Sequence, residues 1–132
     1  MERMSAKDFL AQQANGGGED RRRVRGTKRT TSADGVTHDS AHEAQRWAQL
    51  RLLERAGKIR DLRRQVPFDL EGRDAPILTK GGGRTRRYIA DFVYFDVALG
   101  VEVTEDAKGH DTETSELKRA IMAAMGREVV LV

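Results

Sequence analysis

In the second half of the chain, an apolar run that contains Asp91 is followed by a stretch that alternates hydrophobic and polar residues, and together they predict paired β-strands over residues 86–95 and 101–107. Gly100 ends the short segment between them and suits a hairpin loop of about five residues. We expect one side of the second strand to be open for chemistry, with Asp106 and Lys108 on it. The other side is expected to be buried and to carry Val101, Val103 and Ala107.

A first helix is predicted over residues 41–56. Ser40 followed by Glu43 forms a capping box, in which a hydroxyl and a carboxylate satisfy free backbone amides of the first turn, and Gly57 suits the C-terminal cap. Ahead of the helix, the pair Asp34-Gly35 predicts a tight turn in a small β-ribbon. The helix should bury an apolar stripe at helical spacing, formed by Ala44, Trp47, Ala48, Leu52 and Ala56.

Between this helix and the paired strands, residues 58–70 predict a further strand. Pro67 cannot donate a ladder hydrogen bond, which indicates a sheet edge or a bend. Residues 71–85 contain three consecutive glycines and predict a loop that stays mobile until it meets a ligand.

The last part of the chain predicts a second helix and a final strand. Thr112 or Thr114 suits the helix N-cap and Gly126 its end. The apolar run 128–132 predicts a fully buried strand. The buried helix face should carry Leu117, Ile121, Met122 and Met125.

The predicted order is helix, three strands, helix, strand, which indicates an α/β fold with a mixed central sheet and helices on its faces. A crossover helix between the last two strands predicts that they are parallel. Residues 1–30 predict a flexible basic arm with a helical turn around 6–13, and residues 31–132 a single folded domain.

Composition limits the functional classes. The chain has no cysteine, so disulfides and thiolate zinc sites are excluded and a reducing compartment is expected. No apolar run approaches the roughly 20 residues of a membrane span. We expect a soluble, cytoplasmic protein with no membrane partner and no small-molecule cofactor.

The positive charge is gathered in two places although the formal net charge is only +3. One cluster lies within residues 21–29 and the other within 80–87, around the glycines. Such clusters attract polyanions through counterion release, so a nucleic acid is the expected partner. The phosphate-binding candidates are Arg21, Arg22, Arg23, Arg25, Arg84, Arg86 and Arg87.

Acidic residues on the paired strands supply candidate chemistry. Folding the pair about Ala98 brings Asp91 opposite Glu105 or Asp106 and places Lys108 nearby. Two carboxylates and an ammonium group at one point of a sheet suit a hard divalent cation beside a phosphate. Glu105 shares the parity of the buried side chains, so we favour Asp106, although a bulge would exchange the two.

The order of elements, with Asp91 on one strand and Asp106-Ala107-Lys108 on the next, resembles the PD-(D/E)XK nuclease superfamily. More closely, residues 34–132 resemble a family of small phage and prophage proteins known as domain of unknown function 1064, regarded as part of that superfamily. This chain departs from that family at His38, where an aromatic residue is usual, and at Ala107, where a branched aliphatic is usual. The resemblance rests on Asp34-Gly35, Asp39-Ser40, Glu43-Ala44, Gln65, Phe68, residues 90–94 and 105–109, and Leu117-Lys118.

The resemblance implies that Asp91 and Asp106 bind Mg²⁺ or Mn²⁺, with the carbonyl of Ala107 as a third oxygen, and that Lys108 orients or deprotonates the attacking water. Glu43 would be a further acidic ligand, or would serve only the helix cap. Gln65 would contact a phosphate or only complete a strand, and for Lys118 phosphate binding and plain solvation are both open.

The implied function is a metal-dependent phage-type DNA endonuclease acting in the bacterial host cytoplasm, with branched or junction DNA favoured over a defined duplex sequence. Cutting both strands would be easiest for a symmetric homodimer. The first alternative is a catalytically silent nucleic-acid-binding accessory with the same fold, and the second is a virion or regulatory protein whose arm alone binds DNA.

Overall fold

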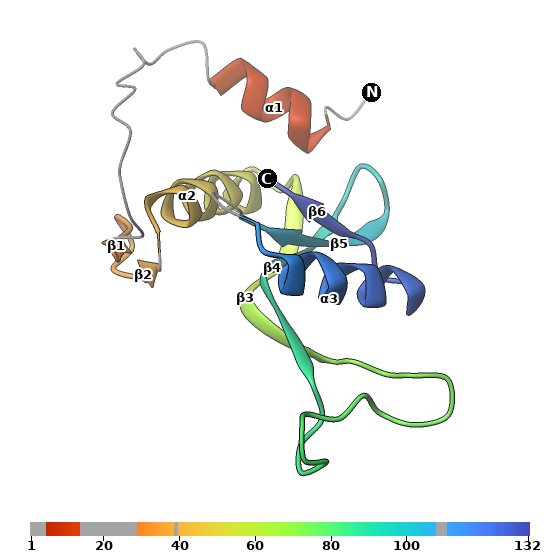
Figure 1. The fold of residues 1–132 in the computed structure, drawn as a ribbon. Helices are drawn as coiled ribbons and strands as arrows, with labels where there is room; N and C mark the ends of the chain where they lie inside the picture. The colour runs from red at the N-terminus through yellow and green to blue at the C-terminus, as the bar shows by residue number, and fades with distance from the viewer. Residues whose placement is uncertain (1–4, 14–28, 39, 108–110) are drawn as a thin grey trace. The chain divides into compact units, whose positions relative to one another are not determined.

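The structure is a computed structural model that describes residues 5–13, 29–38, 40–107 and 111–132. It divides into two compact units, Met1–Leu62 with Tyr94–Glu102 and Arg63–Val93 with Val103–Val132. The described helices and strands run in the order α1 (Ala6–Gln13), β1 (Thr30–Thr31), β2 (Thr37–His38), α2 (Ala41–Arg55), β3 (Ile59–Asp69), β4 (Arg87–Asp96), β5 (Val101–Asp106), α3 (Glu113–Ala124) and β6 (Val129–Leu131) (Figure 1).

Four strands form one sheet in the order β3-β4-β5-β6, and β1 pairs with β2 in a separate antiparallel ribbon. The short connection from Asp96 to Val101 makes β4 and β5 an antiparallel hairpin. β5 and β6 are parallel, with Thr104 opposite Val129. This confirms the predicted α/β class, the mixed sheet, and the helix-strand order from α2 to β6.

The ribbon in the first unit is held by Asp34, as the predicted turn requires. Gly35 has a φ of 85°, the left-handed conformation that glycine adopts without strain. The Asp34 carboxylate accepts hydrogen bonds from the Ser32 hydroxyl at 2.5 Å and from the Trp47 indole at 2.7 Å. These bonds, together with the Val36 amide and the nearby Arg51, lower the pKa of Asp34 to about 2. Asp34 therefore joins the turn to α2.

Helix α2 has the predicted caps but a different buried stripe. The Ser40 hydroxyl accepts the Glu43 amide at 3.1 Å, and Gly57 follows the helix with a φ of 72°. The prediction of Ala48, Leu52 and Ala56 as core residues was wrong, because positions three apart, rather than four apart, face inward on this helix. The helix buries Glu43, Ala44, Trp47, Leu50 and Leu53.

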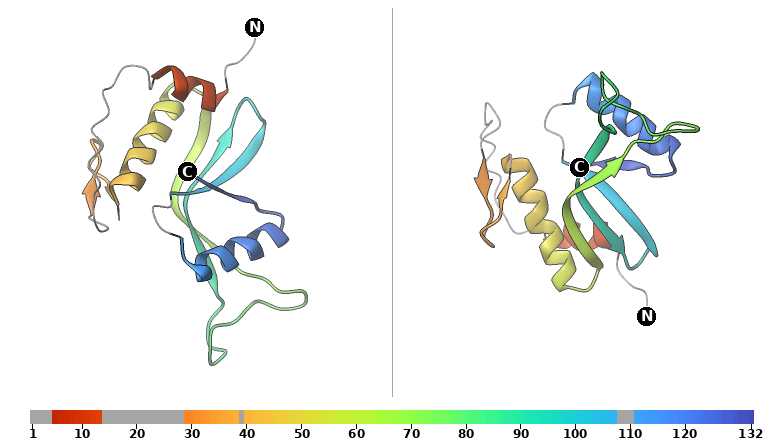
Figure 2. Two further views of the ribbon diagram at one scale, coloured as in Figure 1. Left: turned by 45° about the horizontal axis from the view of Figure 1, so that its top comes forward. Right: turned by 90° about the horizontal axis from the view of Figure 1, so that it is seen from below.

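In the second unit, α3 contacts β6, and Figure 2 shows the two side by side. Thr112 caps α3 by accepting the Ser115 amide at 3.1 Å. Met122 joins the core, but Leu117 and Met125, both predicted to be buried, are 62% and 36% exposed. The core cluster consists of Leu70, Tyr88, Ala90, Val93 and Met122.

The last two strands are less buried than predicted. β6 was expected to be fully buried, but Val130 and Leu131 are exposed because β6 is an edge strand with one neighbour. Val101, predicted to be buried, is exposed as well, because β6 pairs only with residues 104–106 of β5. Sheet position, not hydrophobicity, sets their exposure.

β3 is the other edge strand, and Pro67 lies in it as predicted. Asp61 and Gln65 have φ values of 54° and 52°, so the backbone is left-handed at two non-glycine residues within the strand. Residues in this region are uncommon and are typical of β-bulges, which bend a strand and redirect its side chains.

The predicted loop after β3 is a hydrogen-bonded structure, which we call the hairpin arm (residues 71–86). The Thr79 amide donates to the Arg84 carbonyl and the Arg86 amide to the Ile77 carbonyl, both at 2.7 Å. Antiparallel bridges join Glu71 to Pro76 and Leu78 to Thr85. The glycines 81–83 form its tip, where Gly81 and Gly82 have positive φ.

Across the parts of the chain that the structure describes, no helix is long and apolar enough to cross a membrane.

Replacing Asp34 with Asn should reduce stability at neutral pH and flatten its dependence on pH. The lowered pKa of Asp34, about 2 in the folded protein, means that ionised Asp34 stabilises the fold above pH 4 and that this contribution disappears as the pH falls toward 2. Thermal unfolding by circular dichroism at pH 7, 4 and 2 should therefore give a difference between wild type and Asp34→Asn that shrinks with acid. Asp74→Asn, at an exposed position of the hairpin arm, is the control, and a constant difference for Asp34→Asn would contradict the assignment.

Candidate functional site

Asp91, on β4, lies in the second unit and is held by two neutral donors. The side-chain amide of Gln65 donates to Oδ1 at 3.2 Å, and the main-chain amide of Ala107 donates to Oδ2 at 2.9 Å. Ala107 directly follows Asp106, so this second bond brings the Asp91 carboxylate to the end of β5. The two strands thus meet where the sequence predicted their acidic residues to meet.

Asp106 is the more buried of the two acids, at 2% exposure. Its Oδ2 accepts the hydroxyl of Tyr88 at 2.5 Å, and its carbonyl accepts the Val132 amide at 3.0 Å. The pKa of Tyr88 is raised well above its ordinary value. The largest cause is burial, followed by the hydrogen bond to Asp106 and its negative charge, and then by the negative charge of Asp91. The Tyr88 hydroxyl therefore lies within the field of both carboxylates.

The expected sidedness of β5 was wrong in one respect. Asp106 was predicted on an open side and Glu105 on a buried side, yet both are buried, at 2% exposure each. The Tyr88 side chain covers Asp106 on the side that was expected to be open. Burial therefore does not indicate which of these two acids is the better candidate for a metal ligand. Of the two, Asp106 is the one that accepts the hydrogen bond from Tyr88.

The donor set fits a hard divalent cation. Asp91 and Asp106 supply carboxylate oxygens, the ligand type that hard divalent cations prefer. Mg²⁺ is usually bound through one or two carboxylates together with water and substrate phosphates, so a pair of acids suffices. Within the described ranges, no group of three or more His, Cys, Asp or Glu side chains is arranged to hold a metal.

The Ala107 carbonyl as a third metal ligand and Lys108 as the base stay predictions. Ala107 contributes its amide to Asp91, and that contact does not test the ligand role of its carbonyl. Lys108 lies outside the described residues, as do Arg21, Arg22, Arg23 and Arg25 of the first basic cluster.

Glu43 belongs to the first unit, where it has a structural environment of its own. It is buried, and its carboxylate lies 3.6 Å from Nδ1 of the buried His38. Nε2 of His38 is in turn 3.1 Å from the Ser32 hydroxyl. Glu43 therefore has a role in packing as well as at the helix cap, and its ligand role stays a prediction.

The cations predicted to bind phosphate fall into different settings. Arg87 pairs with Asp69, with 2.7 Å between Nε and Oδ1, and the Lys118 ammonium donates to the Arg87 carbonyl at 3.0 Å. Arg84 and Arg86 are exposed on the hairpin arm. Lys118 is thus engaged with the backbone of β4, and its phosphate role stays a prediction.

Sequence reasoning did not single out Tyr88 or Arg119. The side chain of Arg119 is only 11% exposed and forms a bidentate ion pair with Asp111. This hydrogen bonding raises the pKa of Arg119, and the negative charge of Asp106 acts in the same direction. The position of Tyr88, three residues before Asp91, was the one signal in the sequence, and it does not distinguish a core tyrosine from a partner of Asp106.

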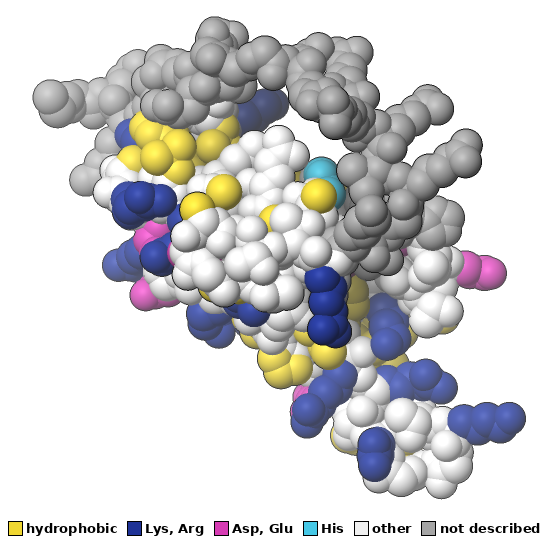
Figure 3. Space-filling view, turned by 90° about the vertical axis from the view of Figure 1, so that its left-hand side faces the viewer, with side chains coloured by type: hydrophobic (Ala, Val, Ile, Leu, Met, Phe, Trp, Pro, Cys, Tyr) yellow, Lys and Arg dark blue, Asp and Glu magenta, His cyan; other side chains and the backbone are white. Residues whose placement is uncertain are grey.

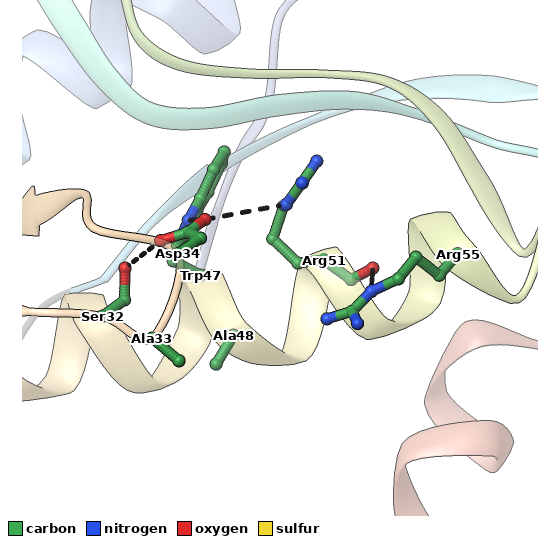
Figure 4. A pocket seen from close by; sticks show the side chains of 7 residues that line it. All are labelled: Ser32, Ala33, Asp34, Trp47, Ala48, Arg51 and Arg55. Atoms are coloured by element: carbon green, nitrogen blue, oxygen red, sulfur yellow. Dashed lines mark hydrogen bonds and ion pairs between the residues drawn. The ribbon is translucent and has the colours of Figure 1, made fainter.

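The first unit contains an open pocket of about 320 Å³ (Figure 4). Arg51 lies between two acids there, with Asp34 at 3.7 Å and Glu54 at 2.6 Å. The Asp34 oxygens are engaged with Ser32 and Trp47, so the polar groups of this pocket mainly hold the ribbon to α2. Its lining residues are Ser32, Ala33, Asp34, Trp47, Ala48, Arg51 and Arg55.

Comparison with known proteins gives one match. The family model described as "Protein of unknown function (DUF1064)" matches residues 23–132, and no curated protein and no solved structure matches. The match covers Asp91, Asp106 and both compact units apart from the first 22 residues. The chain therefore belongs to the DUF1064 family, whose function is unknown.

Proposed function

We propose that this protein is a metal-dependent endonuclease of the PD-(D/E)XK type, with a restriction-endonuclease-like core, that hydrolyses phosphodiester bonds of DNA. The single observation that carries the proposal is the hydrogen bond from the Ala107 amide to Asp91, because it joins the two acidic strands at the predicted point. The order α2-β3-β4-β5-α3-β6 supports it, since that superfamily has the same αβββαβ order.

In this proposal, Asp91 and Asp106 hold Mg²⁺ or Mn²⁺. The ion, when bound, lowers the pKa of water and neutralises charge that develops on the phosphate. The protein's own contribution is to keep the two carboxylates oriented, through Gln65 and Ala107 at Asp91 and through Tyr88 at Asp106. Lys108 follows on the same segment as Asp106 and Ala107, and it would orient or deprotonate the attacking water.

The hairpin arm supports DNA as the substrate. Figure 3 shows Lys and Arg side chains gathered over this part of the molecule, at the bottom of the view. Arg73, Lys80 and Arg84 are exposed there, and among the described residues none of them has an acidic partner within ion-pair distance. Exposed cations without acidic partners are available to phosphate oxygens, which favours contact with the DNA backbone rather than with bases.

Branched or junction DNA is the proposed substrate form, because backbone contacts follow the shape of DNA without reading its sequence. A homodimer is proposed for cuts on two strands, and the cytoplasm of an infected bacterial host is the proposed location. A catalytically silent DNA-binding accessory is the alternative, and it differs by binding DNA without cleaving it.

Replacing either acid should abolish cleavage. Asp91→Asn and Asp106→Asn keep the size of each side chain but remove the charge that binds the cation, so we expect cleavage rates to fall by at least about 100-fold. Lys108→Ala should have a similar effect. The assay incubates four-way junction, duplex and single-stranded DNA with the full chain and Mg²⁺ or EDTA, followed by denaturing electrophoresis.

Asp61→Asn is the matched control for charge, because Asp61 is an exposed carboxylate of β3 that pairs with Arg60. It should cleave like the wild type. Cleavage that survives Asp91→Asn or Asp106→Asn would contradict the proposed site, and wild-type DNA binding without any cleavage would favour the accessory protein.

The hairpin arm should contribute directly to the salt dependence of DNA binding. Removing one cation that binds a phosphate reduces the slope of log K against log salt by about 0.9 for duplex DNA. The double variant Lys80→Ala with Arg84→Ala should therefore show a shallower slope in fluorescence anisotropy titrations at several salt concentrations. The control, Lys7→Ala with Arg55→Ala, removes the same charge from exposed positions of α1 and α2. An equal reduction of the slope in both variants would mean that net charge, not the arm, is responsible.

A further inference from the structure

Resting on the proposed function, we propose that Gln65 is a positioning residue that orients Asp91 for a divalent cation and that the strained backbone of β3 exists to place it. Its Nε2 donates to Asp91 Oδ1 at 3.2 Å, while the Ala107 amide holds Oδ2. Two donors from different segments of the chain fix the plane of one carboxylate. Both of these donors are neutral amide groups.

The backbone of Gln65 is what makes this contact informative. Its φ of 52° lies in the left-handed region, where side chains other than glycine, asparagine and aspartate are strained. Such strain persists only where the surrounding structure enforces it, and it gathers at functional sites. Gln65 therefore needs an explanation that ordinary strand geometry does not supply.

Asp61 shows what a purely structural left-handed residue does in the same strand. At Asp61, with φ of 54°, the alternation of exposed and less exposed residues in β3 is interrupted, because Arg60 and Asp61 are both exposed. This is the phase shift that a bulge produces. Around Gln65 the alternation continues without interruption, with Arg64 and Val66 both less exposed than Gln65.

The left-handed backbone at Gln65 thus does not change which residues of β3 point toward the core. Val66 and Phe68, which follow it, pack against the core cluster in the ordinary alternating pattern. The remaining explanation for the left-handed backbone is the direction of the Gln65 side chain, whose amide reaches Asp91. In this proposal the amide of Gln65 acts on the substrate through Asp91, rather than by contacting a phosphate directly.

The chemistry of the amide suits this position better than a cation would. An arginine or lysine at position 65 would pair with Asp91 and compete with a metal ion for it. An amide donor fixes the orientation of a metal ligand while leaving its charge unchanged, and residues that orient ligands in this way usually affect metal affinity by about 10-fold to 100-fold.

The test compares Gln65→Gly, Gln65→Ala and Asp61→Gly with the wild type in the full chain. Mn²⁺ affinity is measured by isothermal titration calorimetry without DNA, and thermal stability is measured without divalent ions. Gln65→Gly removes both the donor and the strain, so its Mn²⁺ affinity should fall by about 10-fold or more while its unfolding temperature stays the same or rises. Gln65→Ala should lose the same affinity but unfold at a lower temperature than Gln65→Gly, because alanine keeps the strain.

Asp61→Gly is the control, since it relieves the same backbone strain at a side chain that is 79% exposed and pairs with Arg60. It should not lose stability and should bind Mn²⁺ like the wild type. Unchanged Mn²⁺ affinity in Gln65→Gly, or a marked loss of its thermal stability, would overturn the role of Gln65 while leaving the proposed metal site intact. A wild-type protein that does not bind Mn²⁺ would instead overturn the proposed function itself, and this inference with it.

Discussion

The bond between the Ala107 amide and Asp91 is the interaction on which the candidate site depends. A backbone donor at the end of β5 satisfies a side-chain acceptor on β4, so the position of the carboxylate is tied to the path of the main chain. The Asp106 carbonyl accepts the Val132 amide at the same end of β5. Because buried polar groups are costly unless hydrogen-bonded, these bonds allow acidic residues to stand at the end of a buried strand.

The two acids are held in different ways, and the difference has chemical consequences. Asp91 is half-buried and receives two neutral amide donors, whereas Asp106 is buried and receives the hydroxyl of Tyr88. The raised pKa of Tyr88 keeps that hydroxyl protonated, so it remains a donor to Asp106. The hydrogen bonds that hold the two carboxylates thus come from amide and hydroxyl donors.

The first unit has a polar network of its own, and it gives Glu43 an alternative purpose. Asp34, Ser32, His38 and Glu43 follow one another through close polar contacts. In this chain the buried neighbour of Glu43 is the polar side chain of His38. The buried Glu43 thus has a polar neighbour, the buried His38, within its own unit.

The sequence by itself determined the order of elements, the caps at Ser40 and Thr112, the turn at Asp34-Gly35 and the meeting of Asp91 with the end of β5. These features depend on local backbone chemistry and on strand pairing across a short hairpin, and both are visible within a few residues. Tertiary structure alone decided the exposure of β6 and Leu117, the burial of Asp106 beside Tyr88, the ladder in the hairpin arm and the left-handed backbone of Gln65. Each of these depends on which strand lies at a sheet edge and which distant side chain covers it, and periodicity within one segment contains no information about either.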